Sequence, residues 1–178
     1  MTIHQARMES LYLQVCSDYF PDWLAAPDWK IVVDEDAWSH GYDFPFPCTC
    51  WADAETRQFE FNQASILTSS EWMSAEIIYL ICFAQICDVA KEGHGPEWQS
   101  LMVRAADRAA EAGDTFVARI LRYRLAFARR EREETRQRLR ANAGKPFDAK
   151  ILNRQDDELE RLDKEFDELM AMDEKRNG

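Results

Sequence analysis

The chain has 178 residues, and its 33 acidic against 22 basic side chains leave a formal net charge of −11. This length predicts one domain with an appendage, and six tryptophans and ten phenylalanines can supply an apolar core. The negative charge argues against direct nucleic-acid binding and favours a basic or nucleic-acid-binding protein as partner, although solubility alone would also explain it.

The first part of the chain predicts a helix and a small sheet. Residues 6–19 can form the helix. Three short segments, 29–33, 48–52 and 58–61, are rich in β-branched or alternating apolar residues and predict three strands. Together with the helices expected further along the chain, these segments predict an α+β fold.

An apolar helix is expected next. Residues 77–87 read IIYLICFAQIC, and Gln85 is their only strongly polar side chain. A helix that is apolar on every side is buried in protein, and these 11 residues are too few to cross a bilayer. The helix is expected to begin before this apolar run, with Thr68 or Ser69 as its N-cap.

The segment GHGPEW at residues 93–98 resembles the third-ligand segment of the SprT-like (Spartan-type) zinc peptidases. In that family a helix with the motif HExxH precedes this segment, and its two histidines and the later one bind zinc. Counting back nine positions from His94 reaches Gln85, and four positions before that is Ile81, followed by Cys82. The resemblance covers residues 11–112 and implies a zincin-like core, with a three-stranded sheet packed on helices.

The residues at the family's catalytic positions do not suit catalysis. Isoleucine cannot bind zinc, glutamine is a poor zinc ligand, and Cys82 stands where the family has its general base. The resemblance therefore implies a domain that has lost its activity and needs no cofactor. His94 is then expected to be a structural residue at the beginning of a helix, hydrogen-bonded to the backbone.

A rearranged metal site is the alternative. Cys48 and Cys50 form a CxC pair on a predicted strand, so that both side chains point to one face. This pair could form a structural zinc site with Cys87 or His94. His94, Cys82, Cys48 and Cys50 are weak candidates for zinc ligands, because the usual CxxC spacing is absent.

The other cysteines and the first residues indicate the compartment. The chain has five cysteines, an odd number, and we expect free thiols. The beginning, MTIHQARMESLYL, lacks a basic leader followed by an apolar stretch, so we expect a cytoplasmic protein without membrane attachment.

The composition changes after Gly113. Residues 114–142 contain neither proline nor glycine and predict one long helix with nine arginines between positions 119 and 140. After a turn at 144–146, residues 147–174 predict a second helix, with leucines at heptad spacing and ten acidic residues from position 156 onward.

A basic helix followed by an acidic one predicts an antiparallel helical hairpin or coiled-coil extension. We place the domain boundary between residues 112 and 113. Because the apolar seam is thin, a homodimer through these helices is expected as one way to complete it.

The arginines can serve as a nucleic-acid arm or as a solvated, charge-balanced helix face, and the lack of interleaved aromatic residues favours the second interpretation. The candidate partner-binding residues are Asp156, Asp157, Glu158, Glu160, Arg129, Arg130 and Arg132.

Three functions are therefore considered. The favoured one is a non-catalytic inhibitor or adaptor that binds another protein, with a phage or mobile-element anti-defence (anti-CRISPR-like) factor as one form. The second is a zinc peptidase with ligands rearranged around His94. The third is a scaffold protein that dimerises through its C-terminal helices.

Overall fold

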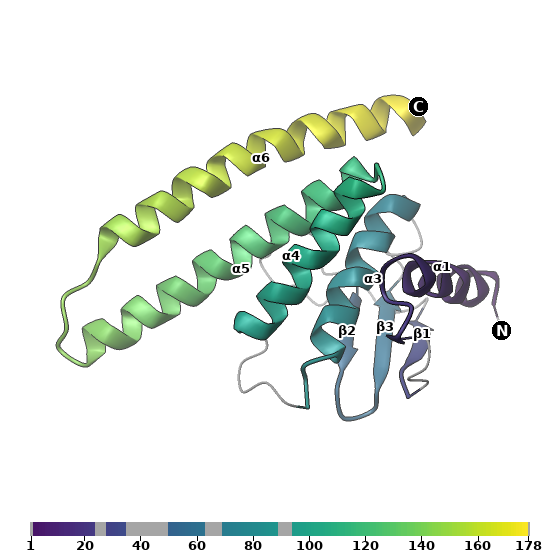
Figure 1. Ribbon diagram of the computed structural model, residues 1–178, viewed down its shortest axis with the longest axis horizontal. Helices are drawn as coiled ribbons and strands as arrows, with labels where there is room; N and C mark the ends of the chain where they lie inside the picture. Colours follow the sequence, from purple (N-terminus) through teal and green to yellow (C-terminus); the bar gives the residue numbers. More distant parts are fainter. Residues whose placement is uncertain (1, 24–27, 35–49, 63–68, 89–93, 178) are drawn as a thin grey trace. The chain divides into compact units, whose positions relative to one another are not determined.

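The computed structural model describes residues 2–23, 28–34, 50–62, 69–88 and 94–177. Within these ranges the fold is α+β and mostly helical, with five helices and one three-stranded sheet (Figure 1). The chain divides into two compact units, Met1–Gly93 and His94–Gly178. This division follows packing, because α4 (Pro96–Glu111) packs on α5 (Thr115–Asn142). The boundary between residues 112 and 113 follows composition and stays a prediction.

The first unit is built around a mixed sheet with the strand order β1-β3-β2. Its central strand β3 (Gln58–Asn62) pairs in parallel with β1 (Lys30–Asp34) and antiparallel with β2 (Cys50–Asp53). Phe59 and Phe61 of β3 are fully buried, as alternation on a half-buried strand predicts. The small three-stranded sheet expected from the sequence is thus confirmed.

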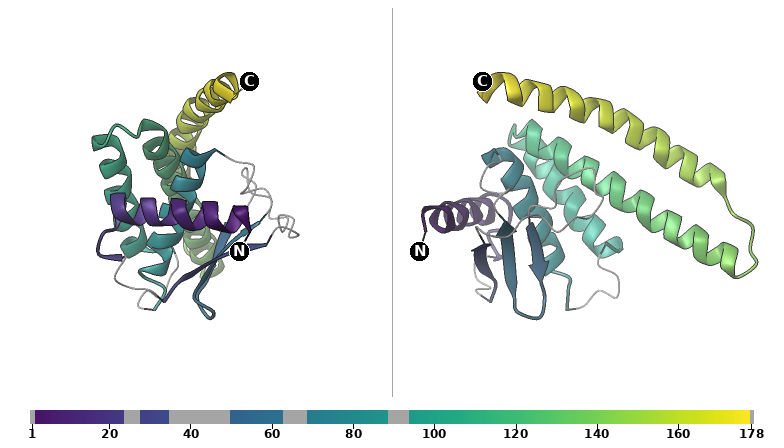
Figure 2. Two further views of the ribbon diagram at one scale, coloured as in Figure 1. Left: turned by 90° about the vertical axis from the view of Figure 1, so that its right-hand side faces the viewer. Right: turned by 180° about the vertical axis from the view of Figure 1, so that it is seen from behind.

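Two helices complete the core of this unit. Helix α1 (Ile3–Tyr19) packs on β1 and on α3 (Ser70–Ala84), which also packs on β2 (Figures 1 and 2). Ser69 is the N-cap of α3, and its hydroxyl oxygen accepts a hydrogen bond from the Trp72 amide at 3.2 Å. Most of its residues are buried, which confirms the prediction of a buried apolar helix.

The second unit contains helices α4, α5 and α6 (Ala149–Asn177). Two glycines with positive φ end the first two helices, Gly113 at +84° and Gly144 at +72°. After α5, the Lys145 amide donates to the Arg140 carbonyl at 2.9 Å, which closes a Schellman motif. The left-handed conformation suits glycine, and Gly144 ends α5 where the sequence predicts the turn after residues 114–142.

Helices α5 and α6 lie side by side (Figures 1 and 2). The Tyr123 hydroxyl donates to Asp163 at 2.6 Å, and Arg130 Nε donates to Asp156 at 2.7 Å. The second contact joins the arginine-rich helix to the acidic one. In the described part of the chain no helix is long and apolar enough to cross a membrane.

Candidate functional site

His94 lies at the entrance to α4, directly before the N-cap Gly95 and Pro96 in the first turn. Proline suits this position because its missing amide would have no partner within the helix. The His94 ring packs on Trp98, with the ring centroids 4.7 Å apart and the planes inclined by 57°. Trp98 is fully buried, so the imidazole covers part of the core of the second unit.

The backbone of His94 is held by a polar chain within the same unit. Gln99 Nε2 donates to the His94 carbonyl at 3.2 Å, and Arg129 Nε donates to Gln99 Oε1 at 3.2 Å. Burial lowers the pKa of His94, and the positive charge of Arg124 lowers it further. The imidazole therefore favours its neutral form, in which it can pack on Trp98 or bind a metal.

The three positions where the family has its motif residues lie in the other unit. Ile81 and Cys82 are in the interior of α3 and are fully buried. Gln85 is the C-cap of this helix and is exposed. Isoleucine offers no ligand atom at all. Two of the three positions at which the family has its motif residues are therefore buried in the core.

A buried thiol and carboxylate lie between β2 and α3. Cys50 Sγ donates to Glu76 Oε2 at 3.4 Å, and Glu76 is 3% exposed. Cys48, the other half of the CxC pair, lies outside the described residues. Among the residues that the structure describes, no group of three or more His, Cys, Asp or Glu side chains could hold a metal ion. The sequence interpretation missed Glu76, although an acidic residue directly before an apolar run was a signal.

A second polar cluster, also missed from the sequence, lies at the turn before β3. Arg57 Nη2 pairs with Asp88 at 2.6 Å, Nη1 donates to Cys87 Sγ at 3.6 Å, and the guanidinium lies 5.6 Å from the Trp29 ring centroid. Burial, and then the charge of Asp88, raises the pKa of Cys87. The sulfur is therefore kept as a thiol and is a poor nucleophile. No local motif connects these residues, since Arg57 and Asp88 are 31 positions apart.

The candidate arginines of α5 are engaged within the second unit. Arg129 donates to Gln99, and Arg130 pairs with Asp156 and with Glu134. Arg132 is only partly exposed. These contacts support the interpretation of the arginine run as a charge-balanced helix face.

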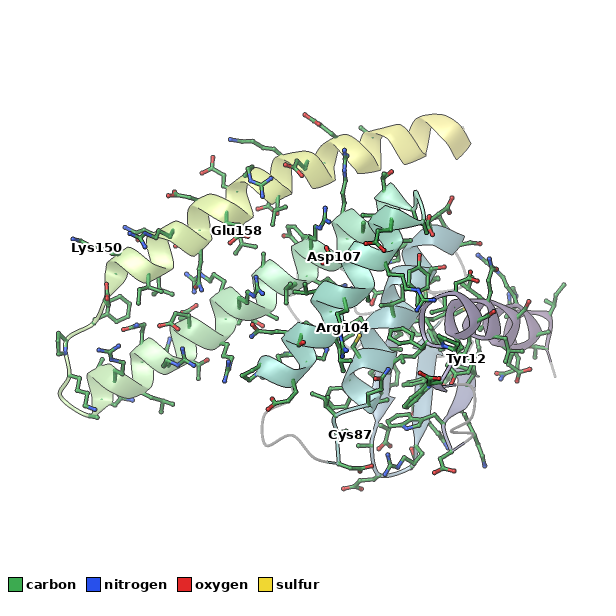
Figure 3. All side chains as sticks on the ribbon, viewed as in Figure 1. Tyr12, Cys87, Arg104, Asp107, Lys150 and Glu158 are labelled. Carbon is green, nitrogen blue, oxygen red and sulfur yellow. The ribbon has the colours of Figure 1, made fainter. Side chains whose placement is uncertain are left out.

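The candidate acidic residues of α6 divide into two pairs. Asp156 accepts from Arg130, and Glu160 pairs with Lys164 at 3.1 Å on the same helix. Asp157 and Glu158 are exposed and form no ion pair with any described residue. Figure 3 shows Glu158 on α6, and these two carboxylates are the ones available to another molecule.

The net charge belongs entirely to one unit. Residues 1–93 contain 15 acidic and 4 basic side chains, whereas residues 94–178 contain 18 of each. The acidic residues of α6 are balanced by basic residues of the same unit, in keeping with the charge-balanced hairpin that the sequence predicts. Any long-range attraction of a basic partner therefore originates mainly in the first unit.

Comparisons with protein-family models, with curated proteins and with solved structures found no match for this chain.

Proposed function

We propose that the chain is a non-catalytic protein-binding protein, an inhibitor or adaptor, built on a degenerate SprT-like domain with a zincin-like core and a C-terminal helical hairpin. The observation that carries this proposal is the charge of the first unit, with 15 acidic and 4 basic residues. Such a unit attracts basic proteins, including those that bind nucleic acid, and repels nucleic acid itself. An anti-CRISPR-like factor that blocks a nucleic-acid-handling host complex is the form that size and charge favour.

Residues at the family's catalytic positions support the absence of catalysis. Ile81 has no ligand atom, and Cys82 has no exposed surface on which to activate a water molecule. What this scaffold still offers to other molecules is its surface, and the net negative charge of the chain belongs to the first unit.

Capture from a bacterial lysate by the full chain tests the proposal. We expect a basic protein to bind at low salt and to be released at high salt, because salt screens exposed charges. The variant Asp18→Asn, Asp22→Asn, Glu55→Gln removes three exposed charges from the first unit and should weaken capture. A matched variant on α6, Asp157→Asn, Glu158→Gln, Glu168→Gln, should retain it. Capture that survives high salt and the first variant would contradict an electrostatic partner site.

The alternative function is a zinc-dependent peptidase with ligands rearranged around His94. The neutral imidazole of His94 is able to bind zinc, and it would supply one ligand of such a site. Elemental analysis of the purified full chain separates the two functions. We expect no stoichiometric zinc in the wild type. One zinc per chain that is lost in His94→Ala, together with peptidase activity that depends on the zinc, would establish the alternative and overturn the proposal.

A further inference from the structure

The α5–α6 pair carries opposite charges at its two ends. Residues 136–154, here called the basic end, include the connection between the helices and contain six basic residues and one acidic residue. Residues 156–174, here called the acidic stretch, contain ten acidic and two basic residues. Figure 3 shows Lys150 at the beginning of α6 and Glu158 farther along the same helix. The second unit is neutral as a whole but strongly polarised along these helices.

The ion pairs within this unit do not include all of its charged residues. Pairs such as Arg130–Asp156 and Arg136–Glu133 neutralise some of these charges. Several exposed charges form no ion pair with any residue that the structure describes. At the basic end these are Arg140, Lys145, Lys150 and Arg154, and in the acidic stretch they are Asp157, Glu158, Asp167 and Glu168.

The basic end also exposes large apolar side chains. Leu139 is 65% exposed, Phe147 is 51% exposed and Ile151 is 38% exposed. Single exposed apolar residues are common on protein surfaces. Here, however, three lie within 13 residues of the chain, around one connection. Apolar side chains gathered among unpaired cations are typical of a docking surface.

The basic end cannot reach the far part of the acidic stretch of its own chain. Lys150 and Glu168 belong to one helix and are 18 residues apart, which at ~1.5 Å per residue corresponds to about 27 Å. A second copy of the chain can supply the missing charges. When two copies lie antiparallel, the basic end of each faces the acidic stretch of the other, and both contacts form at once around a two-fold axis. A parallel arrangement would place like charges together.

We propose that the basic end docks on the acidic stretch of α6 in a second copy of this chain, forming an antiparallel dimer whose apolar contacts come from Leu139, Phe147 and Ile151. The dimer does not depend on the partner of the acidic first unit, so either proposal can fail alone. An anionic ligand such as nucleic acid would use the basic end but leave the acidic stretch without a role.

Sedimentation velocity on the full chain tests the dimer. We expect a reversible dimer whose dissociation constant rises with salt, because exposed charges are screened. The basic-end variant Lys145→Glu, Lys150→Glu should weaken the dimer by at least about tenfold, and so should the acidic-stretch variant Asp157→Lys, Glu158→Lys, because each places like charges face to face. Arg104→Glu, Arg119→Glu reverses two exposed charges outside both segments and should leave it unchanged.

Mixing the two reversed variants gives the sharpest result. In an antiparallel pair the reversed basic end of one variant faces the reversed acidic stretch of the other, so the mixture should form a 1:1 heterodimer. Circular dichroism of each variant checks that its helices are intact. A wild type that stays monomeric at all concentrations, or variants that fail to combine while remaining folded, would overturn the proposal. So would a dimer unaffected by either reversal, even if the basic-end variant lost affinity for a fluorescent oligonucleotide.

Discussion

At the scale of single residues, Gln5 shows how one side chain can hydrogen-bond the outer edge of a sheet. Its amide nitrogen donates to the Ile31 carbonyl at 2.8 Å, and its amide oxygen accepts from the Val33 amide at 3.0 Å. The side chain thus satisfies backbone groups of β1, an outer strand of the sheet, in the way that a further strand would. It also accounts for the position of α1 on β1.

Replacing Gln5 with alanine should lower the free energy of unfolding. The two hydrogen bonds to β1 and one to Glu9 are lost, and two backbone groups of β1 lose their partner, which costs about 1–3 kcal/mol. Urea denaturation of the full chain measures this change. Gln14→Ala, at an exposed position of the same helix, is the control and should change stability by about 0.5 kcal/mol or less. Equal effects of the two substitutions would contradict the role of Gln5.

His94 makes the stability of the chain depend on pH. Its pKa in the folded chain lies below the ordinary value of 6.5, so the unfolded chain takes up a proton more readily. The stabilising contribution of the neutral imidazole is therefore complete above the unfolded pKa and declines as pH falls below about 6.5. The free energy of unfolding of the wild type should fall more steeply between neutral and mildly acidic pH than that of His94→Gln. Parallel pH profiles for the two proteins would refute this assignment.

At the scale of elements, Gln137 holds the connection between α5 and α6. It is fully buried near the end of α5. Its oxygen accepts from the Asp148 amide at 3.1 Å, and its nitrogen donates to Glu133 Oε1 at 2.7 Å. The beginning of α6 is thereby attached to the end of α5 through one amide side chain. Burial of a glutamine without such partners would be unfavourable.

Substituting Gln137 with alanine should loosen this connection. The Asp148 amide and the buried Glu133 lose a partner, and we expect a loss of about 1–3 kcal/mol in the free energy of unfolding. Hydrogen exchange at the Asp148 amide should become faster, which reports on the connection itself. Thr135→Ala, an exposed position one residue from Arg136 on α5, is the matched control and should leave this exchange rate unchanged. Unchanged exchange in Gln137→Ala would mean that the amide is protected by other contacts.

At the scale of the whole molecule, the chain consists of an acidic unit and a neutral one. The buried residues of the second unit include Trp98 and Met102 of α4 and Ile120 and Leu121 of α5. Because α4 and α5 pack on each other, this unit has a core of its own. Residues 94–178 produced alone should be largely helical by circular dichroism and unfold cooperatively. A random-coil spectrum would show that the unit requires residues 1–93.

Much of the fold could be predicted from residue patterns because the decisive interactions are local. Alternation in residues 58–61 predicts β3, the apolar run from Ile77 predicts a buried helix, and the turn with Gly144 predicts where α5 ends. Each of these signals depends on neighbours within a few residues, through strand alternation, helix burial or the backbone freedom of glycine. The expected α+β class and the number of strands follow from them.

The polar clusters could not be predicted in this way. The Cys50–Glu76 pair joins residues 26 positions apart, and the Arg57–Asp88 pair joins residues 31 positions apart. Such pairs depend on how strands and helices pack, and no spacing in the sequence encodes them. The excess negative charge of residues 1–93 becomes a property of one folded unit only when the division of the chain into two units is known.

The sequence by itself determined the helices, the strands and the total charge of this protein, because local preference and composition depend only on which residues are near in the chain. Only the tertiary structure decided which charges are paired and which remain exposed, since packing brings distant side chains within a few ångströms of each other. It placed Arg130 against Asp156, gave Glu76 a buried thiol partner, and left Lys150 and Glu158 exposed on one helix without an ion-pair partner among the described residues.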